Sequence, residues 1–167
     1  MPNLILMRHA NAELASPGMR DFDRPLSKNG YAEAHITAKM FLQTGFTISS
    51  VFCSPARRTI ETLASLRETI PIDEDVMACP DGLYSGDVSS YQSLVSSLET
   101  GANCLIIGHN PMIEHFAFGL VQNGDGTGLS QLKMGFTTAA IAIIELNGAA
   151  NVQISNAKLL HFLNPHS

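Results

Sequence analysis

The sequence has no surplus of positive charge and no long apolar run. Its 167 residues include 10 Lys and Arg against 15 Asp and Glu, a formal net charge of −5. Without a basic surplus there is little to displace the counterions of a phosphate backbone, so we expect no nucleic-acid partner. The longest apolar runs, such as residues 139–144, are far too short to cross a bilayer, and we expect no membrane partner.

Cysteine is also scarce. Cys53, Cys79 and Cys104 are an odd number without CxxC spacing, which is typical of reduced thiols in a cytoplasm. We interpret all three as small buried apolar side chains. The apolar residues 4–7 follow no basic segment and end at once in Arg8, so we expect no secretory signal and predict a cytoplasmic location.

The hydrophobic fraction of 45% is that of an ordinary globular protein. No repeat, low-complexity tract or linker divides the chain, which predicts a single domain over residues 1–167. Short apolar runs typical of buried strands alternate with helical patterns. The strands are expected at 3–8, 51–54 and 103–108, and the helices at 27–44, 56–70, from 87 and from 111. This alternation predicts an α/β protein, a three-layer α/β/α sandwich around a mostly parallel central sheet.

The C-terminal part of the sequence has a different pattern. The glycines at 124, 126 and 128 indicate a flexible loop with no strand leading into it. After it, residues 137–146 and 151–155 flank Asn147-Gly148, a strong turn signal, and predict a hairpin. We expect this hairpin to add an antiparallel edge strand to the sheet.

Cationic and imidazole side chains follow three of the predicted strands. Arg8 and His9 follow the first, Arg58 follows the second, and His109 follows the third. The carboxyl ends of parallel strands meet at one edge of a sheet, where ligands collect. The second and third segments also begin helices, whose N-termini favour anions. The sequence therefore predicts one anion site, whereas Arg57 is more simply a solvated charge.

These residue types suit phosphoryl transfer, in which charge develops on the equatorial oxygens. Guanidinium groups bind phosphate oxygens in pairs. A neutral imidazole can attack phosphorus in line and hold it covalently until water arrives. A second imidazole can donate to the transferring oxygens when it is protonated. We therefore predict a phosphatase with an imidazole nucleophile and without metal or cofactor, because the remaining histidines, at 35, 115, 161 and 166, form no ligand cluster.

Four motifs occur in a fixed order along the chain. They are Leu-Met-Arg-His at 6–9, Arg-Pro-Leu-Ser at 24–27, Ser-Pro-x-x-Arg-Thr-x-x-Thr at 54–62 and Gly-His-Asn-Pro at 108–111. This set resembles the histidine phosphatase superfamily, which has the phosphoglycerate mutase-like fold. The SixA-type phosphohistidine phosphatases are the branch it resembles most.

The resemblance implies a role for each matching residue. Arg8 and Arg58 would clamp the phosphate, His9 would become phosphorylated, and His109 would be the second histidine of the site. Arg24 would lie at the substrate mouth. We also count Asn110, beside His109, as a candidate substrate-binding residue.

Two departures from the family pattern bear on function. Ala10 stands where the superfamily has glycine, which is tolerated if that position does not need a positive φ. The glutamate that protonates an alcohol leaving group in the wider superfamily is missing, since residues 83–85 are Leu-Tyr-Ser. Asp81 and Asp87 are near, but Asp87 is also a good helix cap.

The missing acid favours one substrate class. An imidazole has a pKa of about 6.5, so it leaves with far less protonation than an alkoxide needs. The short segment 72–86 also predicts an open site. We expect hydrolysis of phosphohistidine on a protein, such as a histidine-phosphorylated phosphocarrier or signalling domain. The alternatives are a general phosphomonoesterase acting on a small phosphorylated metabolite and a non-catalytic module that binds a phospho-ligand.

Overall fold

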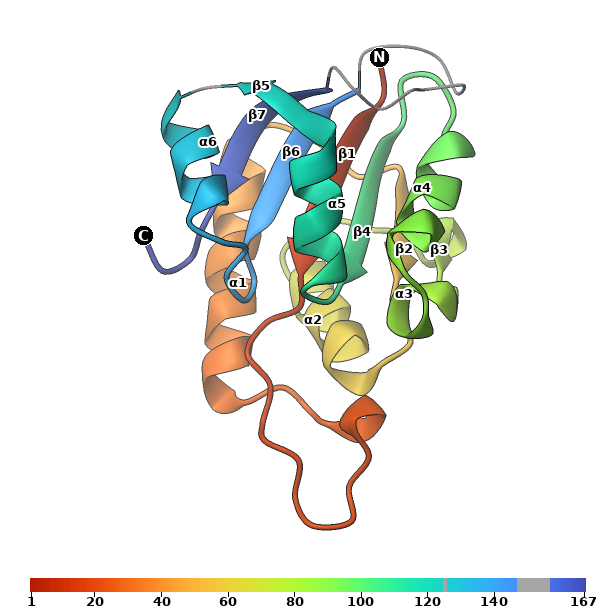
Figure 1. Ribbon diagram of the computed structural model, residues 1–167. Helices are drawn as coiled ribbons and strands as arrows, with labels where there is room; N and C mark the ends of the chain where they lie inside the picture. Colours follow the sequence, from red (N-terminus) through yellow and green to blue (C-terminus); the bar gives the residue numbers. More distant parts are fainter. Residues whose placement is uncertain (125, 147–156) are drawn as a thin grey trace.

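The computed structural model describes residues 1–124, 126–146 and 157–167. Within these residues the centre of the molecule is a seven-stranded sheet in the order β3-β2-β4-β1-β6-β7-β5 (Figure 1). The strands are β1 (Asn3–Arg8), β2 (Ser50–Cys53), β3 (Met77–Ala78), β4 (Asn103–Gly108), β5 (Val121–Gly124), β6 (Ile141–Glu145) and β7 (Ala157–Leu163). The helices are α1 (Lys28–Gln43), α2 (Arg57–Arg67), α3 (Gly82–Ser85), α4 (Val88–Ser96), α5 (Met112–Leu120) and α6 (Gly126–Lys133), with short 3-10 turns η1 (Asp21–Asp23) and η2 (Glu74–Val76).

Alternate residues of β1 point to opposite faces of the sheet, and each face has its own helical layer. Ile5 and Met7 pack in the core beneath α1 and α2, whereas Leu4 and Leu6 pack in the core beneath α3, α4, α5 and α6. Figure 1 shows these two layers on either side of the sheet. The predicted α/β/α sandwich is therefore confirmed.

The sheet is mostly parallel, as predicted, because β1, β4, β2 and β3 all pair in parallel. The antiparallel strand is β6, and the prediction that it lies at an edge is wrong. It lies between β1 and β7 and pairs antiparallel with both. Residues 141–144 are buried, as expected of an inner strand. The predicted turn at 147–148 and partner strand at 151–155 lie outside the described residues, and the strand that pairs with β6 is β7.

The start of α1 agrees with the helix predicted at 27–44, but helical spacing alone does not give the buried faces of α1 and α2. Ser27 caps α1, its Oγ accepting from the Gly30 amide at 3.0 Å. The buried stripe of α1 is made mainly of small residues, so Leu42 is 46% exposed although its spacing predicts a core position. Ile60 of α2 is likewise 39% exposed, because threonines and serines form much of the buried face of that helix.

The segment around residue 124 differs most from expectation. Helix α5 ends at Leu120, and Val121 begins β5 instead of continuing the helix. The glycines expected in a flexible loop lie at the end of β5 and in α6. β5 pairs with β7, more than thirty residues later in the chain, and such a partner cannot be read from local pattern. Cys79 is exposed on the surface, unlike the buried Cys53 and Cys104.

Gly30 allows the chain that follows β1 to lie directly against α1. A Cβ at Gly30 would overlap the Asn11 carbonyl group, whose oxygen also accepts from the Ser27 amide at 2.9 Å. Because Asn11 follows His9 by two residues, this contact fixes the loop at the end of β1.

We predict that Gly30→Ala lowers the free energy of unfolding by about 1–3 kcal/mol, because the added methyl group must displace backbone atoms. Urea denaturation of the purified variant measures this. Gly119→Ala is the matched control, since a Cβ there has no neighbouring atom within 4 Å. That change should leave stability unchanged or raise it by up to about 1 kcal/mol. Equal stability of the two variants would contradict the role of the Asn11 contact.

Candidate active site

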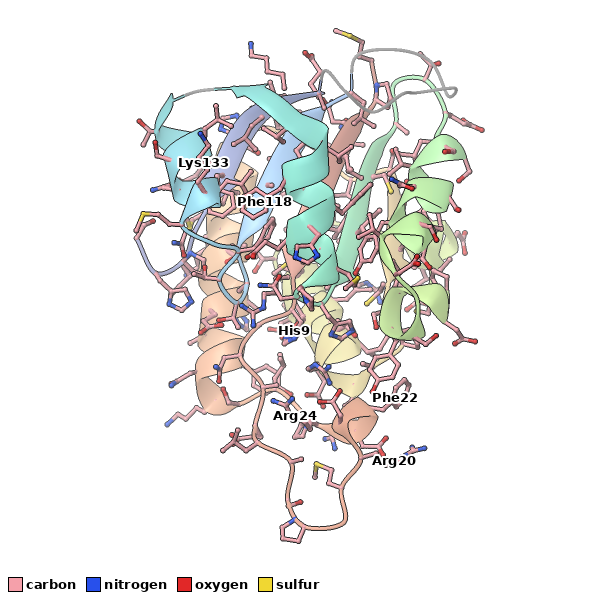
Figure 2. All side chains as sticks on the ribbon, in the orientation of Figure 1. His9, Arg20, Phe22, Arg24, Phe118 and Lys133 are labelled. Carbon is pink, nitrogen blue, oxygen red and sulfur yellow. The ribbon has the colours of Figure 1, made fainter. Side chains whose placement is uncertain are left out.

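The carboxyl ends of β1, β2 and β4 lie side by side, because these strands pair in parallel with aligned registers. The loop that joins β1 to α1 extends beyond this edge and includes η1 (Figure 1). Figure 2 shows His9 at the end of the sheet, with Arg24 and Phe22 on the loop beyond it. The candidate site is thus bounded by strand ends on one side and by the loop on the other.

His9 is held in one orientation by hydrogen bonds of its backbone amide and of both ring nitrogens. Its amide donates to the Gly108 carbonyl at 3.1 Å, which ties it to the end of β4. The ring Nδ1 lies 2.7 Å from the Ala10 carbonyl oxygen, and Nε2 lies 3.3 Å from Nε of Arg58. A carbonyl oxygen only accepts and a guanidinium only donates, so Nδ1 carries the proton and Nε2 is the free base.

Arg58 is the central cation of the site. Its side chain comes from the first turn of α2 and is 6% exposed. While Nε donates to His9, its two terminal nitrogens donate to Asp21, Nη1 to the backbone oxygen at 2.7 Å and Nη2 to Oδ2 at 3.0 Å. One guanidinium group therefore joins the end of β1 to the η1 turn of the loop.

His109 lies against His9 at the end of β4. The two rings are tilted, with centroids 5.2 Å apart. Its Nε2 is 2.7 Å from Ser54 Oγ, at the end of β2, while its Nδ1 is buried without a hydrogen-bond partner in the described part of the chain. The two rings of the site therefore follow β1 and β4, and Ser54, which follows β2, orients the ring of His109.

Burial keeps both imidazoles neutral. Desolvation is the main cause that lowers the pKa of His9 to about 4, and Arg58 and Arg8 lower it further. Desolvation also lowers the pKa of His109 to about 3, with His9 and Arg58 contributing. Contrary to the expectation of a protonated second imidazole, His109 is thus neutral at physiological pH in this structure. A neutral ring still carries one N–H donor, so His109 needs no extra proton to donate.

Arg8, the last residue of β1, contacts the segment before β6. Its Nη1 donates to the Phe136 carbonyl at 2.9 Å, and its buried Nε has no partner among the described residues. Asn110 points to the same segment, with Nδ2 donating to the Phe136 carbonyl at 3.1 Å and to Glu114 at 3.3 Å. Asn110 neither caps α5 nor contacts either imidazole in the described hydrogen bonds, since Pro111 is the N-cap of α5.

Ala10 replaces a glycine of the family pattern without strain. It is fully buried and is not among the positive-φ positions of the described chain. Its amide donates to Thr62 Oγ at 3.1 Å, and Thr62 belongs to the same helix as Arg58. The alanine therefore keeps the backbone contact that holds His9 against α2.

Asp21 is the residue that the sequence analysis missed. Its Oδ1 accepts from Arg24 at 2.9 Å, and its Oδ2 accepts from Arg58 and, at 3.2 Å, from the Tyr84 hydroxyl. The Arg24 hydrogen bond is the largest of the causes that lower the pKa of Asp21 to about 2. Asp21 precedes Arg24 by three residues, a spacing that suits an ion pair, but only the folded chain joins it to Arg58.

The candidate acids named from sequence lie elsewhere. Asp87 caps α4, its Oδ1 accepting from the Ser89 amide at 2.8 Å. Asp81 is exposed at the start of α3, and no described contact joins it to the imidazoles. Arg57 pairs with Glu61 at 2.7 Å on the surface of α2, as expected of a solvated charge. In the described hydrogen bonds Arg24 donates to Asp21 Oδ1 and to the Glu13 carbonyl, and its charge also lowers the pKa of His9.

No group of three or more potential metal ligands occurs in residues 1–124, 126–146 and 157–167. In the same ranges, no helix is both long and apolar enough to span a membrane.

Several known proteins are similar to this chain. Residues 4–78 match the model of the histidine phosphatase superfamily (branch 1). The phosphohistidine phosphatase SixA of Escherichia coli is 28% identical over 162 residues, which cover 93% of this chain and 95% of SixA. A chloroplastic protein of Arabidopsis thaliana is 32% identical over 117 residues, 64% of this chain and 53% of that protein. The match thus spans about half the length of the Arabidopsis protein.

The fold comparison extends along the whole chain. A crystal structure from Agrobacterium tumefaciens, assigned as a SixA phosphohistidine phosphatase, superposes with a TM-score of 0.80 at 28% identity and covers 98% of both chains. The chain is thus similar to the histidine phosphatase superfamily, a similarity that indicates a phosphatase. Its similarity to SixA-type proteins extends over nearly the whole chain.

We predict that acid destabilises the protein through its two buried imidazoles. Their pKa values, about 4 and 3, lie below the value of about 6.5 expected in the unfolded chain, so the unfolded state binds more protons as pH falls. Stability from these groups is therefore present above pH 6.5 and declines below it, by about 2 kcal/mol per histidine between pH 7 and pH 5.

Urea denaturation at both pH values measures this loss. His9→Asn should reduce the difference between pH 7 and pH 5 by about 2 kcal/mol, whatever its effect on stability at pH 7. An unchanged difference would show that His9 titrates normally in the folded protein.

Proposed function

We propose that the protein hydrolyses phosphohistidine on a phosphorylated protein through a covalent phosphohistidine intermediate on His9. The observation that carries this proposal is the state of the His9 ring. Its Nδ1 proton is held by the Ala10 carbonyl, and its basic Nε2 faces the guanidinium of Arg58. A neutral imidazole in a fixed orientation beside a cation is prepared to attack an anionic phosphoryl group.

In the first step, the Nε2 lone pair of His9 forms a bond to phosphorus as the bond to the leaving group breaks. The pKa of about 4 keeps this lone pair available at neutral pH. The phosphorylated ring is then a cation with its proton on Nδ1, which the Ala10 carbonyl accepts. The positive charge that desolvation disfavours in the empty site is balanced by the transferred phosphoryl group.

Arg58, Arg8 and His109 would stabilise the phosphoryl oxygens during transfer. The single N–H of Arg58 Nε donates to the Nε2 lone pair of His9 before attack, and it is released to a phosphoryl oxygen when that lone pair bonds to phosphorus. Arg8 has a buried Nε without a partner in the described chain. His109 has a similarly unpartnered Nδ1 while Ser54 occupies its Nε2. Because Ser54 can donate its hydroxyl proton to Nε2, Nδ1 can carry the ring proton and donate it to a phosphoryl oxygen.

In the second step, water attacks the phosphorus of phosphorylated His9. The phosphorus–nitrogen bond breaks, its electron pair returns to Nε2, and His9 is again neutral with its proton on Nδ1. The protons of the water remain on the released phosphate. The imidazole is a good leaving group in this step, so no dedicated acid is required.

A phosphohistidine substrate suits a site without an acid near the imidazoles. Asp21, the carboxyl group joined to Arg58, has a pKa of about 2 and is ionised, so it cannot protonate an alkoxide at neutral pH. Similarity to the phosphohistidine phosphatase SixA of Escherichia coli supports the same substrate class.

The general phosphomonoesterase and the non-catalytic binding module remain testable alternatives. Comparing rates on a histidine-phosphorylated protein and on a panel of sugar phosphates separates the first. Hydrolysis in ¹⁸O-labelled water separates the second, because a module that only binds incorporates no label into released phosphate.

We predict that His9→Asn abolishes phosphate release from a histidine-phosphorylated protein and abolishes labelling of the enzyme by ³²P. The loss should exceed about a thousandfold, because no other described group can take the place of the attacking Nε2. His115→Asn is the matched control, since His115 is exposed on α5 and should keep full activity. Turnover by the His9 variant would exclude His9 as the nucleophile.

We predict that Arg58→Lys lowers kcat about a hundredfold or more while the protein remains folded. An ammonium group can neutralise charge, but it cannot contact His9 and Asp21 with the geometry of a planar fork. Steady-state kinetics on the same substrate measures the loss. Arg57→Lys, a surface change in the adjacent residue, should have little effect. Equal kcat for the two variants would contradict the role of Arg58.

A further inference from the structure

The carboxylate of Asp21 lies one guanidinium group away from the nucleophile. Arg58 contacts His9 Nε2 through Nε and Asp21 Oδ2 through Nη2. In-line attack by Nε2 leaves the departing group on the far side of phosphorus from His9, and the loop that carries Asp21 extends beyond the sheet edge at which His9 lies (Figure 1). The proposal that follows rests on the proposed function, because it concerns the substrate of the same site.

Asp21 still has capacity to accept a hydrogen bond. Each carboxylate oxygen has two lone pairs. Oδ2 uses both, on Arg58 and the Tyr84 hydroxyl, but Oδ1 accepts from Arg24 alone within the described residues. The side chain is 53% exposed, so an incoming group can reach it. The three donors hold the carboxylate in place and keep it ionised.

An aromatic surface adjoins this carboxylate. Tyr84 lies edge-on to His109, with ring centroids 5.7 Å apart, and edge-on to Phe22, with centroids 5.0 Å apart. The Tyr84 hydroxyl donates to Asp21, so the carboxylate and this aromatic group form one unit. A flat ring that leaves from the phosphoryl site would find an apolar surface and an anion together.

We propose that Asp21 accepts a hydrogen bond from the protonated ring of the substrate phosphohistidine, at the nitrogen that does not carry the phosphoryl group. In this cationic form the ring leaves as neutral imidazole. The phosphorus–nitrogen bond breaks, its electron pair stays on the departing nitrogen, and the proton remains on the other nitrogen. Each of the two rings then has an oxygen that accepts its remaining N–H. For the departing ring it is the Asp21 carboxylate, and for His9 it is the Ala10 carbonyl.

The charged groups around Asp21 determine how the rate of hydrolysis should depend on pH. Its carboxylate faces Arg24 on its own loop, Arg58 on α2 and Tyr84 on α3. Nearby in the same loop, Arg20 and Asp23 form an ion pair with each other, with Arg20 Nε 2.7 Å from Asp23 Oδ2. The imidazoles of His9 and His109 titrate far below neutral pH, so they limit activity only in acid. The alkaline limit of the reaction should therefore be the loss of the proton from the substrate ring, which a neighbouring carboxylate delays.

The experiment compares kcat/KM for a histidine-phosphorylated protein across pH 6 to 10 in the unmodified enzyme, Asp21→Asn and Asp23→Asn. In Asp21→Asn we expect kcat/KM to begin its alkaline decline about one pH unit lower than in the unmodified enzyme. At a given alkaline pH this is about a tenfold loss of activity, in addition to any loss seen at low pH. Asp23→Asn removes the same charge from the same loop without touching Arg58, and its limb should stay in place.

The outcomes separate the possible roles. A fall in rate that is equal at every pH in Asp21→Asn would mean that Asp21 only orients Arg58, and would overturn the proposal. An equal shift in both variants would mean that general loop charge is responsible and would also overturn it. If the unmodified enzyme releases no phosphate from the phosphorylated protein, the proposed function itself fails, which is a different result from either.

Discussion

The guanidinium of Arg58 is the contact on which the site depends. It is almost fully buried, and its Nε and two terminal nitrogens donate to His9 and to Asp21. Burying a cation is costly unless it is paired and hydrogen-bonded, so the strand end and the loop must stay where these acceptors satisfy it. The position of the η1 turn, and with it the ionised Asp21, follows from this requirement.

Desolvation gives the site its chemical character. Burial makes hydrogen-bond partners necessary for the Arg58 guanidinium. It also lowers the pKa values of His9 and His109, which leaves both rings neutral. A neutral ring can act as a nucleophile or as a single donor, and the Ala10 and Ser54 contacts assign the ring nitrogens. The histidines are therefore prepared by burial and by backbone and hydroxyl contacts, with no carboxylate hydrogen-bonded to either ring in the described chain. This arrangement suits a leaving group that needs no strong acid.

Sequence predictions were correct where the feature depends on nearby residues and failed where it depends on distant ones. Nearby residues determine the strand at Asn3–Arg8, the start of the helix at Ser27 and the side chains that follow each parallel strand, and all three were predicted. The pairing of β5 with β7 and the inner position of β6 depend on distant partners, and both were missed. Leu42 and Ile60 have helical spacing, but the packing of small residues on α1 and α2 left them exposed.

The sequence by itself determined which chemical groups would meet, because parallel strands bring Arg8, His9, Arg58 and His109 to one sheet edge. Tertiary structure alone decided their protonation, since pKa values depend on burial and on charges from distant segments. It also decided that Asp21, not Asp81 or Asp87, adjoins the site, because the path of the loop across α2 is set by the contact with Arg58. Residue types and periodicity contain no information on that path.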